Sequence, residues 1–165
     1  QMTERGWVHE EQGGLTYHAP DASALLSPEF MEQHCFGAEV TESRILLRFA
    51  PNSARQRIPE IQGEVSLDRG THRLERLTYD YVSLPLPRAA SGHAGGEVSF
   101  AVAPNGLWLV TEWWIRMPVV TERSTRFGGS TVSNARVSEI REQGGRILRI
   151  RSGREVVDVT APPPG

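Results

Sequence analysis

The tripeptide Pro104-Asn105-Gly106 lies between two stretches, 95–103 and 107–117, that contain many β-branched and aromatic residues. Asn-Gly favours the positive φ angles of a tight hairpin turn, and flanking residues of these types favour strands. The same region holds three of the four tryptophans, Trp108, Trp113 and Trp114. The sequence therefore predicts an antiparallel hairpin with a broad aromatic surface, which assigns the domain to a β class.

Strand-and-turn units occupy most of the remaining chain. A first hairpin is predicted around Gln12-Gly13-Gly14, where glycine supplies the positive φ of a turn. A last hairpin is predicted to turn at Gln143-Gly144-Gly145 for the same reason, with arms at 131–141 and 146–152. Alternating or β-branched segments predict further strands at 35–40, 44–49, 61–67, 73–84 and 156–159.

One helix stands out in this pattern. Ser27-Pro28-Glu29 combines a hydroxyl N-cap, a proline at the first helical position and an acid in the first turn. It predicts a helix over about 28–34, the longest in the chain. We therefore expect a mainly β fold: a strongly curved antiparallel meander sheet, half-barrel or barrel, with one short helix packed on it. Residues 1–160 are expected to form one domain, and 161–165 a proline-rich tail.

Composition excludes several classes of protein. The chain has 165 residues, 38% of them hydrophobic and 23% charged, which is typical of a single globular domain. The net charge of −2 argues against a nucleic-acid-binding protein, although all 18 basic residues are arginine. No apolar stretch approaches the ~20 residues of a transmembrane helix, and no signal peptide is recognisable at the start.

The second arm of the tryptophan hairpin is apolar on both sides. Strict alternation places Trp113, Ile115 and Met117 on one side, and Trp108, Val110 and Trp114 on the other. Such a strand is either covered on both faces, here by the sheet core and the predicted helix, or exposes one face to a ligand. In the second case the candidate ligand-binding residues line an apolar concavity: Phe100, Trp108, Val110 and Trp114.

Other candidate sites are weaker. His34-Cys35 is the one place where a thiol adjoins an imidazole in sequence, but neighbouring residues at a helix-to-strand junction point apart, so Cys35 is expected to be buried and structural. His9 and His18 are expected to face each other across the first hairpin, as two metal ligands at most. Metal-ligand spacing and phosphate-binding glycine motifs are missing from the sequence, so we expect neither a metal nor a cofactor.

Several short segments together resemble the C-terminal region of bacterial envelope proteins described as carboxypeptidase-regulatory-like domain proteins, of the kind found in Gemmatimonadota. The resemblance spans about 6–118 and is carried by segments 17–27, 30–36, 49–51, 57–63, 67–68, 74–81, 95–100 and 113–118, the last reading Trp113-Trp-Ile-Arg-Met-Pro118. It implies a periplasmic or outer-membrane-associated setting and no peptidase activity. The stretch 61–68, with its returning strand, also resembles the hairpins of LolA-like lipoprotein-carrier half-barrels.

These observations predict a non-enzymatic envelope domain with a binding or structural role. The first expectation is a lipid-like apolar ligand in the concave face of the sheet. The alternatives are a module that docks an envelope protein by adding a strand to a sheet edge, and a hydrolase that uses Cys35.

Overall fold

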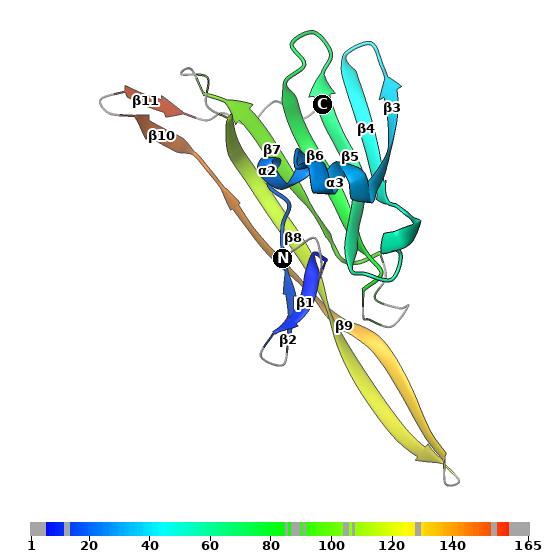
Figure 1. The fold of residues 1–165 in the computed structure, drawn as a ribbon. Coiled ribbons are helices and arrows are strands. Elements are labelled where there is room, and N and C mark those ends of the chain that lie inside the picture. The colour runs from blue at the N-terminus through cyan, green and yellow to red at the C-terminus, as the bar shows by residue number, and fades with distance from the viewer. Residues whose placement is uncertain are drawn as a thin grey trace.

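The structure is a computed structural model that describes residues 6–11, 14–84, 86, 90, 92–103, 106, 108–127, 130–152 and 155–158. Its main element is an antiparallel sheet of seven strands, in which each strand pairs with its neighbours in sequence (Figure 1). The strands are β3 (His34–Val40), β4 (Arg44–Pro51), β5 (Glu60–Asp68), β6 (Leu74–Val82), β7 (Gly95–Val102), β8 (Trp108–Phe127) and β9 (Ser130–Arg146). The predicted mainly β, antiparallel meander fold is confirmed. The sheet is open rather than a barrel, because β3 pairs only with β4 and β9 only with β8 among the described residues.

Two short helices and a hairpin lie on one side of the sheet (Figure 1). They are α2 (Ala22–Leu25), α3 (Pro28–Gln33) and the pair β1 (Val8–Glu11) and β2 (Gly14–Tyr17). The longest helix, α3, begins as predicted, because the hydroxyl of Ser27 accepts a hydrogen bond from the Phe30 N–H at 3.1 Å. α2 lies where the sequence also suggests a helical turn before α3, at about 21–26, and a 3₁₀ turn, η1 (Ser53–Arg55), was not predicted. We call this side of the sheet the covered face and the other side the opposite face.

Alternation along the strands sends large apolar side chains to the covered face. On β6, Leu77, Tyr79 and Tyr81 are buried as predicted, whereas the residues between them are exposed. Phe30 of α3 packs into this core from the helix side, and its ring centroid lies 5.4 Å from that of Phe49 on β4. The buried core contains Trp7, Val8, Leu25, Phe30, Phe49, Ile61, Leu77, Tyr79, Tyr81, Ala94, Val98, Phe100 and Ile115.

The glycine pair Gly144-Gly145 does not form the predicted turn. β9 continues through both residues, and they pair with Trp114 and Trp113 on β8. A Cβ atom at Gly144 would lie 2.6 Å from the carbonyl oxygen of Trp113, and one at Gly145 would lie 3.0 Å from the Nε1 atom of the Trp113 indole. The prediction of a last hairpin here is wrong, because these glycines provide the space in which the two tryptophans approach β9.

Beyond the main sheet, β8 and β9 continue as a two-stranded ribbon (Figure 1). β7 pairs with β8 only as far as Arg116, while the β8–β9 pairing continues to Phe127 and Ser130. A separate hairpin of β10 (Arg149–Ser152) and β11 (Glu155–Asp158) follows at the end of β9. The predicted tail, 161–165, lies outside the described residues.

Candidate functional site

One irregularity in the β7–β8 pairing decides where the aromatic side chains of β8 point. Ser99 pairs with Glu112, but the next residue, Phe100, pairs with Val110. Thr111 is therefore an extra residue in β8, and its side chain donates a hydrogen bond to the carbonyl oxygen of Ser99 at 3.2 Å. A β-bulge of this kind shifts the alternation of the side chains by one residue.

The four residues predicted to bind a ligand are consequently divided between two surfaces. Phe100 is buried in the core, and Val110 packs against the same core. Trp108, two residues from Val110 along the strand, belongs to the covered face and is 49% exposed. Trp114 instead lines a hollow on the opposite face. The expectation that Trp108, Val110 and Trp114 share one face is wrong, since the bulge at Thr111 reverses the faces between them.

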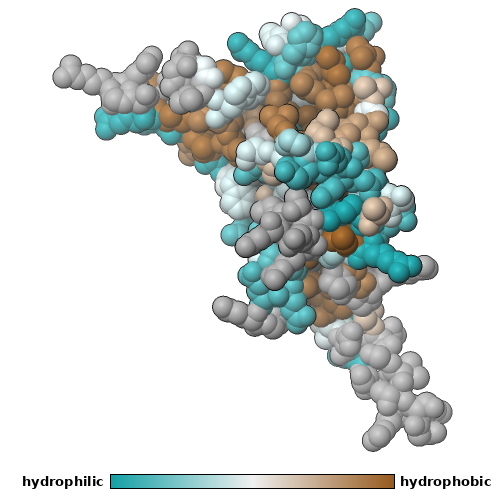
Figure 2. All heavy atoms as spheres, viewed as in Figure 1, coloured by the Kyte–Doolittle hydropathy of each residue, from teal (hydrophilic) through white to brown (hydrophobic). Residues whose placement is uncertain are grey.

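The helices leave part of the covered face open near the hairpin tips. Figure 2 shows apolar surface over this upper part of the sheet, next to the helices. Val40 at the end of β3 is 59% exposed, and Leu26, directly after α2, is 79% exposed at the border. We call the apolar side chains of this region the apolar shelf, in which Val40 and Trp108 are exposed and the others are half-buried; by strand register they are Val40, Ile45, Leu67, Leu74, Val102 and Trp108. The shelf is the part of the predicted apolar surface that solvent can reach.

The opposite face carries charged residues in cross-strand pairs. Arg48 on β4 contacts Glu39 on β3 at 2.8 Å and Glu64 on β5 at 3.0 Å. Arg116 on β8 contacts Glu142 on β9 at 3.0 Å. Further pairs on this face are Arg44–Glu75, Arg76–Glu97 and Glu112–Arg146.

A hollow of about 450 Å³ opens on this opposite face. Its apolar wall includes the Trp114 indole, and the guanidinium carbon of Arg116 lies 4.6 Å from the centroid of that ring. Backbone without side chains forms part of the lining at Gly63, Gly95 and Gly96. Sequence alternation alone did not indicate this hollow, because its residues come from six strands, β4 to β9, and from the segment before β7.

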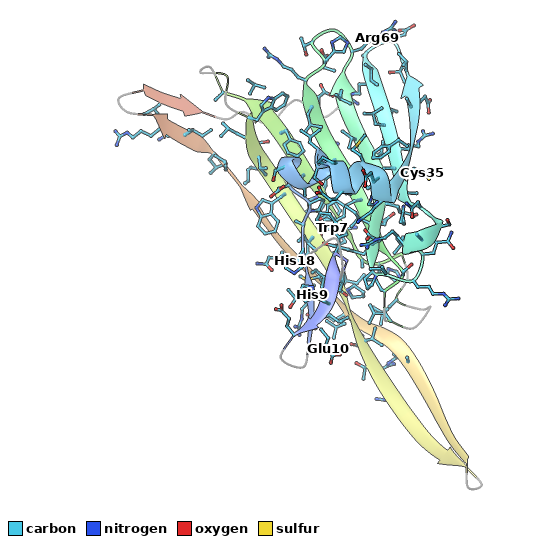
Figure 3. The ribbon with its side chains drawn as sticks, in the orientation of Figure 1. Trp7, His9, Glu10, His18, Cys35 and Arg69 are labelled. Carbon is cyan, nitrogen blue, oxygen red and sulfur yellow. The ribbon has the colours of Figure 1, made fainter. Side chains whose placement is uncertain are left out.

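Cys35 is exposed on the edge strand β3, so the expectation of a buried structural cysteine is wrong. The preceding residue, His34, is buried, and its Nδ1 atom lies 3.0 Å from the carbonyl oxygen of Phe30. Successive residues of a strand point to opposite faces, which takes the thiol away from this imidazole. Figure 3 shows Cys35 at the outer edge of the sheet, far from His9 and His18.

The buried imidazole of His34 belongs to a polar cluster under the helices. Arg55 of η1 donates through Nε to Glu60 at 2.7 Å, and its Nη2 atom contacts the same carboxylate oxygen. The other oxygen of Glu60 lies 3.7 Å from the Nε2 atom of His34. Arg55 is the last residue of η1, Glu60 is the first of β5 and His34 is the first of β3. We therefore infer that the cluster holds these three elements together.

His9 and His18 face each other across the first hairpin, as predicted. Their rings stack with centroids 4.8 Å apart and planes inclined by 17°. The Nε2 atom of His9 lies 2.8 Å from a carboxylate oxygen of Glu11, and this hydrogen bond lowers the pKa of Glu11. Stacked rings do not direct their nitrogens at one point, and the described residues contain no group of three or more metal-ligating side chains placed to hold an ion.

Comparison with family models, with curated proteins and with solved structures finds no match for this chain. None of the described helices has the length and hydrophobicity needed to cross a membrane.

Proposed function

We propose that this chain is a non-enzymatic binding domain of the bacterial cell envelope that holds a lipid-like apolar ligand on the apolar shelf. The envelope setting rests on the sequence resemblance alone. The observation that carries the binding role is the exposed apolar surface itself, at whose two ends Val40 and Trp108 are 59% and 49% exposed. Contiguous exposed apolar surface is costly in water and is typical of ligand or partner sites.

The shape of the shelf suits an extended apolar chain. It runs across β3 to β6 at one height of the sheet, because Val40 pairs with Ile45, Ile45 with Leu67 and Leu67 with Leu74. On β7 and β8, Val102 pairs with Trp108. Burial of one such aliphatic side chain contributes about 1.5–3 kcal/mol. A ligand that contacts a few of them gains enough to bind at micromolar concentrations.

The test is a titration with cis-parinaric acid, a fatty acid whose fluorescence rises in apolar surroundings. We expect Val40→Glu and Trp108→Ser each to weaken its binding by about tenfold. The matched control is Ile140→Glu, which changes an exposed apolar residue of β9 (46% exposed) that lines the hollow on the opposite face. Equal affinity in all four proteins, or equal weakening by Ile140→Glu, would contradict the proposal.

A second candidate function is docking of an envelope protein by strand addition to β3. The observation that favours it is an edge free of irregularities: β3 pairs with β4 in continuous register from His34–Pro51 to Val40–Ile45, and no described strand pairs with its other side. An edge of this kind is a template for a further strand unless charge, proline or a bulge protects it.

The exposed thiol of Cys35, the only cysteine of the chain, allows a direct test of this edge. A photocrosslinker attached there should trap a defined partner from an envelope extract. The Thr41 N–H donates a hydrogen bond to the Arg44 carbonyl oxygen, and hydrogen-bonded pairs alternate along an antiparallel ladder, so the N–H of Ala38 points away from β4. Ala38→Pro removes this donor from the edge of β3 that no described strand pairs with, where proline is tolerated; we expect it to abolish the crosslink. Identical crosslinks with Ala38→Pro would exclude strand addition, while leaving ligand binding on the shelf unaffected.

A further inference from the structure

We propose that the hollow on the opposite face is a binding site for a small organic cation, an ammonium or guanidinium group attached to an apolar portion. This site is separate from the apolar shelf, because it lies on the other side of the same strands. The proposal rests on the side chains that line the hollow and on the ion pairs around it.

The lining combines an apolar wall with a polar floor. Trp114 of β8 and Ile140 of β9 provide the wall, while Thr78 and Asp80 of β6 provide polar groups. A volume of about 450 Å³ lies within the ~300–1,000 Å³ typical of small-molecule sites. A pocket with an aromatic wall and a few convergent polar groups is typical of sites for amphipathic small molecules.

The arginines of the hollow are already matched by carboxylates. Arg48 lies against both Glu39 and Glu64, and Arg116 lies against Glu142 with its guanidinium over the Trp114 ring. Within the lining, Arg48 and Arg116 balance Glu64 and Asp80 in charge. The ion-pair partners Glu39 and Glu142 just outside it leave an excess of two negative charges around the hollow. The site therefore favours a cation over an anion.

Asp80 adds the carboxylate that such a cation would contact. It lies in the hollow with no ion pair or side-chain hydrogen bond to any described residue. Its partner on β7 is Gly95, where a Cβ atom would lie 2.5 Å from the carbonyl oxygen of Tyr79 and 2.8 Å from the Asp80 carboxylate, so the glycine leaves space beside this carboxylate. The Asp80 carboxylate would bind the cationic group by charge, and the Trp114 indole, which already carries the Arg116 guanidinium over its ring, would contact the apolar portion of the ligand.

The experiment is a titration of the ¹⁵N-labelled protein with benzylamine, followed through the indole N–H resonances. We expect the Trp114 resonance, assigned with Trp114→Phe, to shift, and that of Trp113, on the covered face, to stay in place. Asp80→Asn should weaken benzylamine about tenfold or more. Asp80 is exposed, so this variant should keep the fold, which its unfolding temperature verifies. Glu75→Gln, on the same strand outside the hollow, is the matched control.

Three further probes identify the chemistry and the source of the cation. Benzyl alcohol and benzoate have the same ring without the positive charge, and we expect both to bind at least tenfold more weakly than benzylamine. N-acetyl-lysine methylamide, a blocked lysine, tests whether the cation belongs to a peptide side chain. Affinity equal to that of benzylamine would indicate a peptide as the source of the cation. Lower affinity would indicate a free amine. Equal affinity for benzyl alcohol or benzoate, an unchanged affinity in Asp80→Asn, or no shift of Trp114 would overturn the proposal.

Discussion

The two faces of this sheet are built from the same strands and differ in almost every physical respect. On β6, Leu77 is completely buried on the covered face, while its neighbour Thr78 is exposed on the opposite face. On β8, Trp113 packs against the core and Trp114 lines the hollow. Burial of apolar side chains on the covered face contributes most of the free energy of folding. The opposite face has ion pairs and the hollow instead.

Within this single sheet, the covered face provides most of the stability, and the opposite face is the one that can vary without loss of the fold. Apolar burial contributes about 1.5–3 kcal/mol per large side chain, whereas an exposed ion pair contributes about 0–1 kcal/mol. Substitutions of exposed residues on the opposite face should therefore cost little stability. The predictions below compare the two faces, beginning with the largest effect.

Leu77→Ala should be the most destabilising of these changes. The side chain lies between Val65 and Val98 in the neighbouring strands and is 0% exposed. Its truncation leaves a cavity in the core, which costs about 2–5 kcal/mol. Thr78→Ala, one residue away on the opposite face, should change the free energy of unfolding by less than about 0.5 kcal/mol. Urea denaturation measures both, and similar losses would mean that the two faces contribute equally.

Tyr79 links the stability of the covered face to alkaline pH. Burial raises the pKa of this phenol from 10.0 to about 12, so the folded protein binds the phenolic proton more tightly than the unfolded chain. The stabilisation is complete below pH 10 and is lost as the pH rises to about 12. At about 1.4 kcal/mol per pKa unit, the loss amounts to about 2–3 kcal/mol.

Tyr79→Phe removes this pH dependence, because phenylalanine has no proton to lose. At pH 7 we expect a stability close to that of the native protein, because the buried hydroxyl has no hydrogen-bond partner of normal geometry among the described residues. Between pH 10 and 12 the variant should lose less stability than the native protein, although Tyr81, whose pKa burial also raises, still contributes. Urea denaturation across this pH range tests the prediction, and identical pH profiles would contradict it.

Glycines inside strands give a third comparison. Gly144→Ala brings a Cβ atom to 2.6 Å from the Trp113 carbonyl oxygen, so β9 must move away from β8, at a cost of about 1–3 kcal/mol. Gly37→Ala on β3 meets nothing within 4 Å and should stabilise the strand by about 0.5–1 kcal/mol. Thermal unfolding should give opposite signs. The same sign for both would mean that the approach of Trp113 and Trp114 to β9 is not the reason for the glycine pair.

The sequence predicted the buried positions correctly wherever apolar and polar residues alternate regularly along a strand. The buried positions of β6 and the capped start of α3 at Ser27 were predictable, because both depend on residues close together in the chain. Pro104-Asn105-Gly106 likewise marked the reversal between β7 and β8. Local chemistry thus predicts most of the strand order of a meander, in which consecutive strands pair.

What the sequence did not reveal depends on contacts between strands. The extra residue Thr111 has no distinctive local signal, yet it moves Trp114 to the face opposite Trp108. Gly144-Gly145 has the composition of a turn, like Gln12-Gly13-Gly14, and only the two tryptophans on the facing strand explain its place inside β9. The hollow was not predicted for the same reason, since its lining is assembled across the sheet.

The smallest expected effect concerns the ion pairs of the opposite face. Arg76 on β6 and Glu97 on β7 lie 3.4 Å apart, outside the hollow, and the arginine side chain is 50% exposed. A double-mutant cycle with Arg76→Met and Glu97→Gln should give a coupling energy of about 0.2–1 kcal/mol. Added salt should reduce it further, because exposed charges are screened. A coupling well above this range that persists at high salt would show that the opposite face, and not the core alone, determines the stability of the sheet.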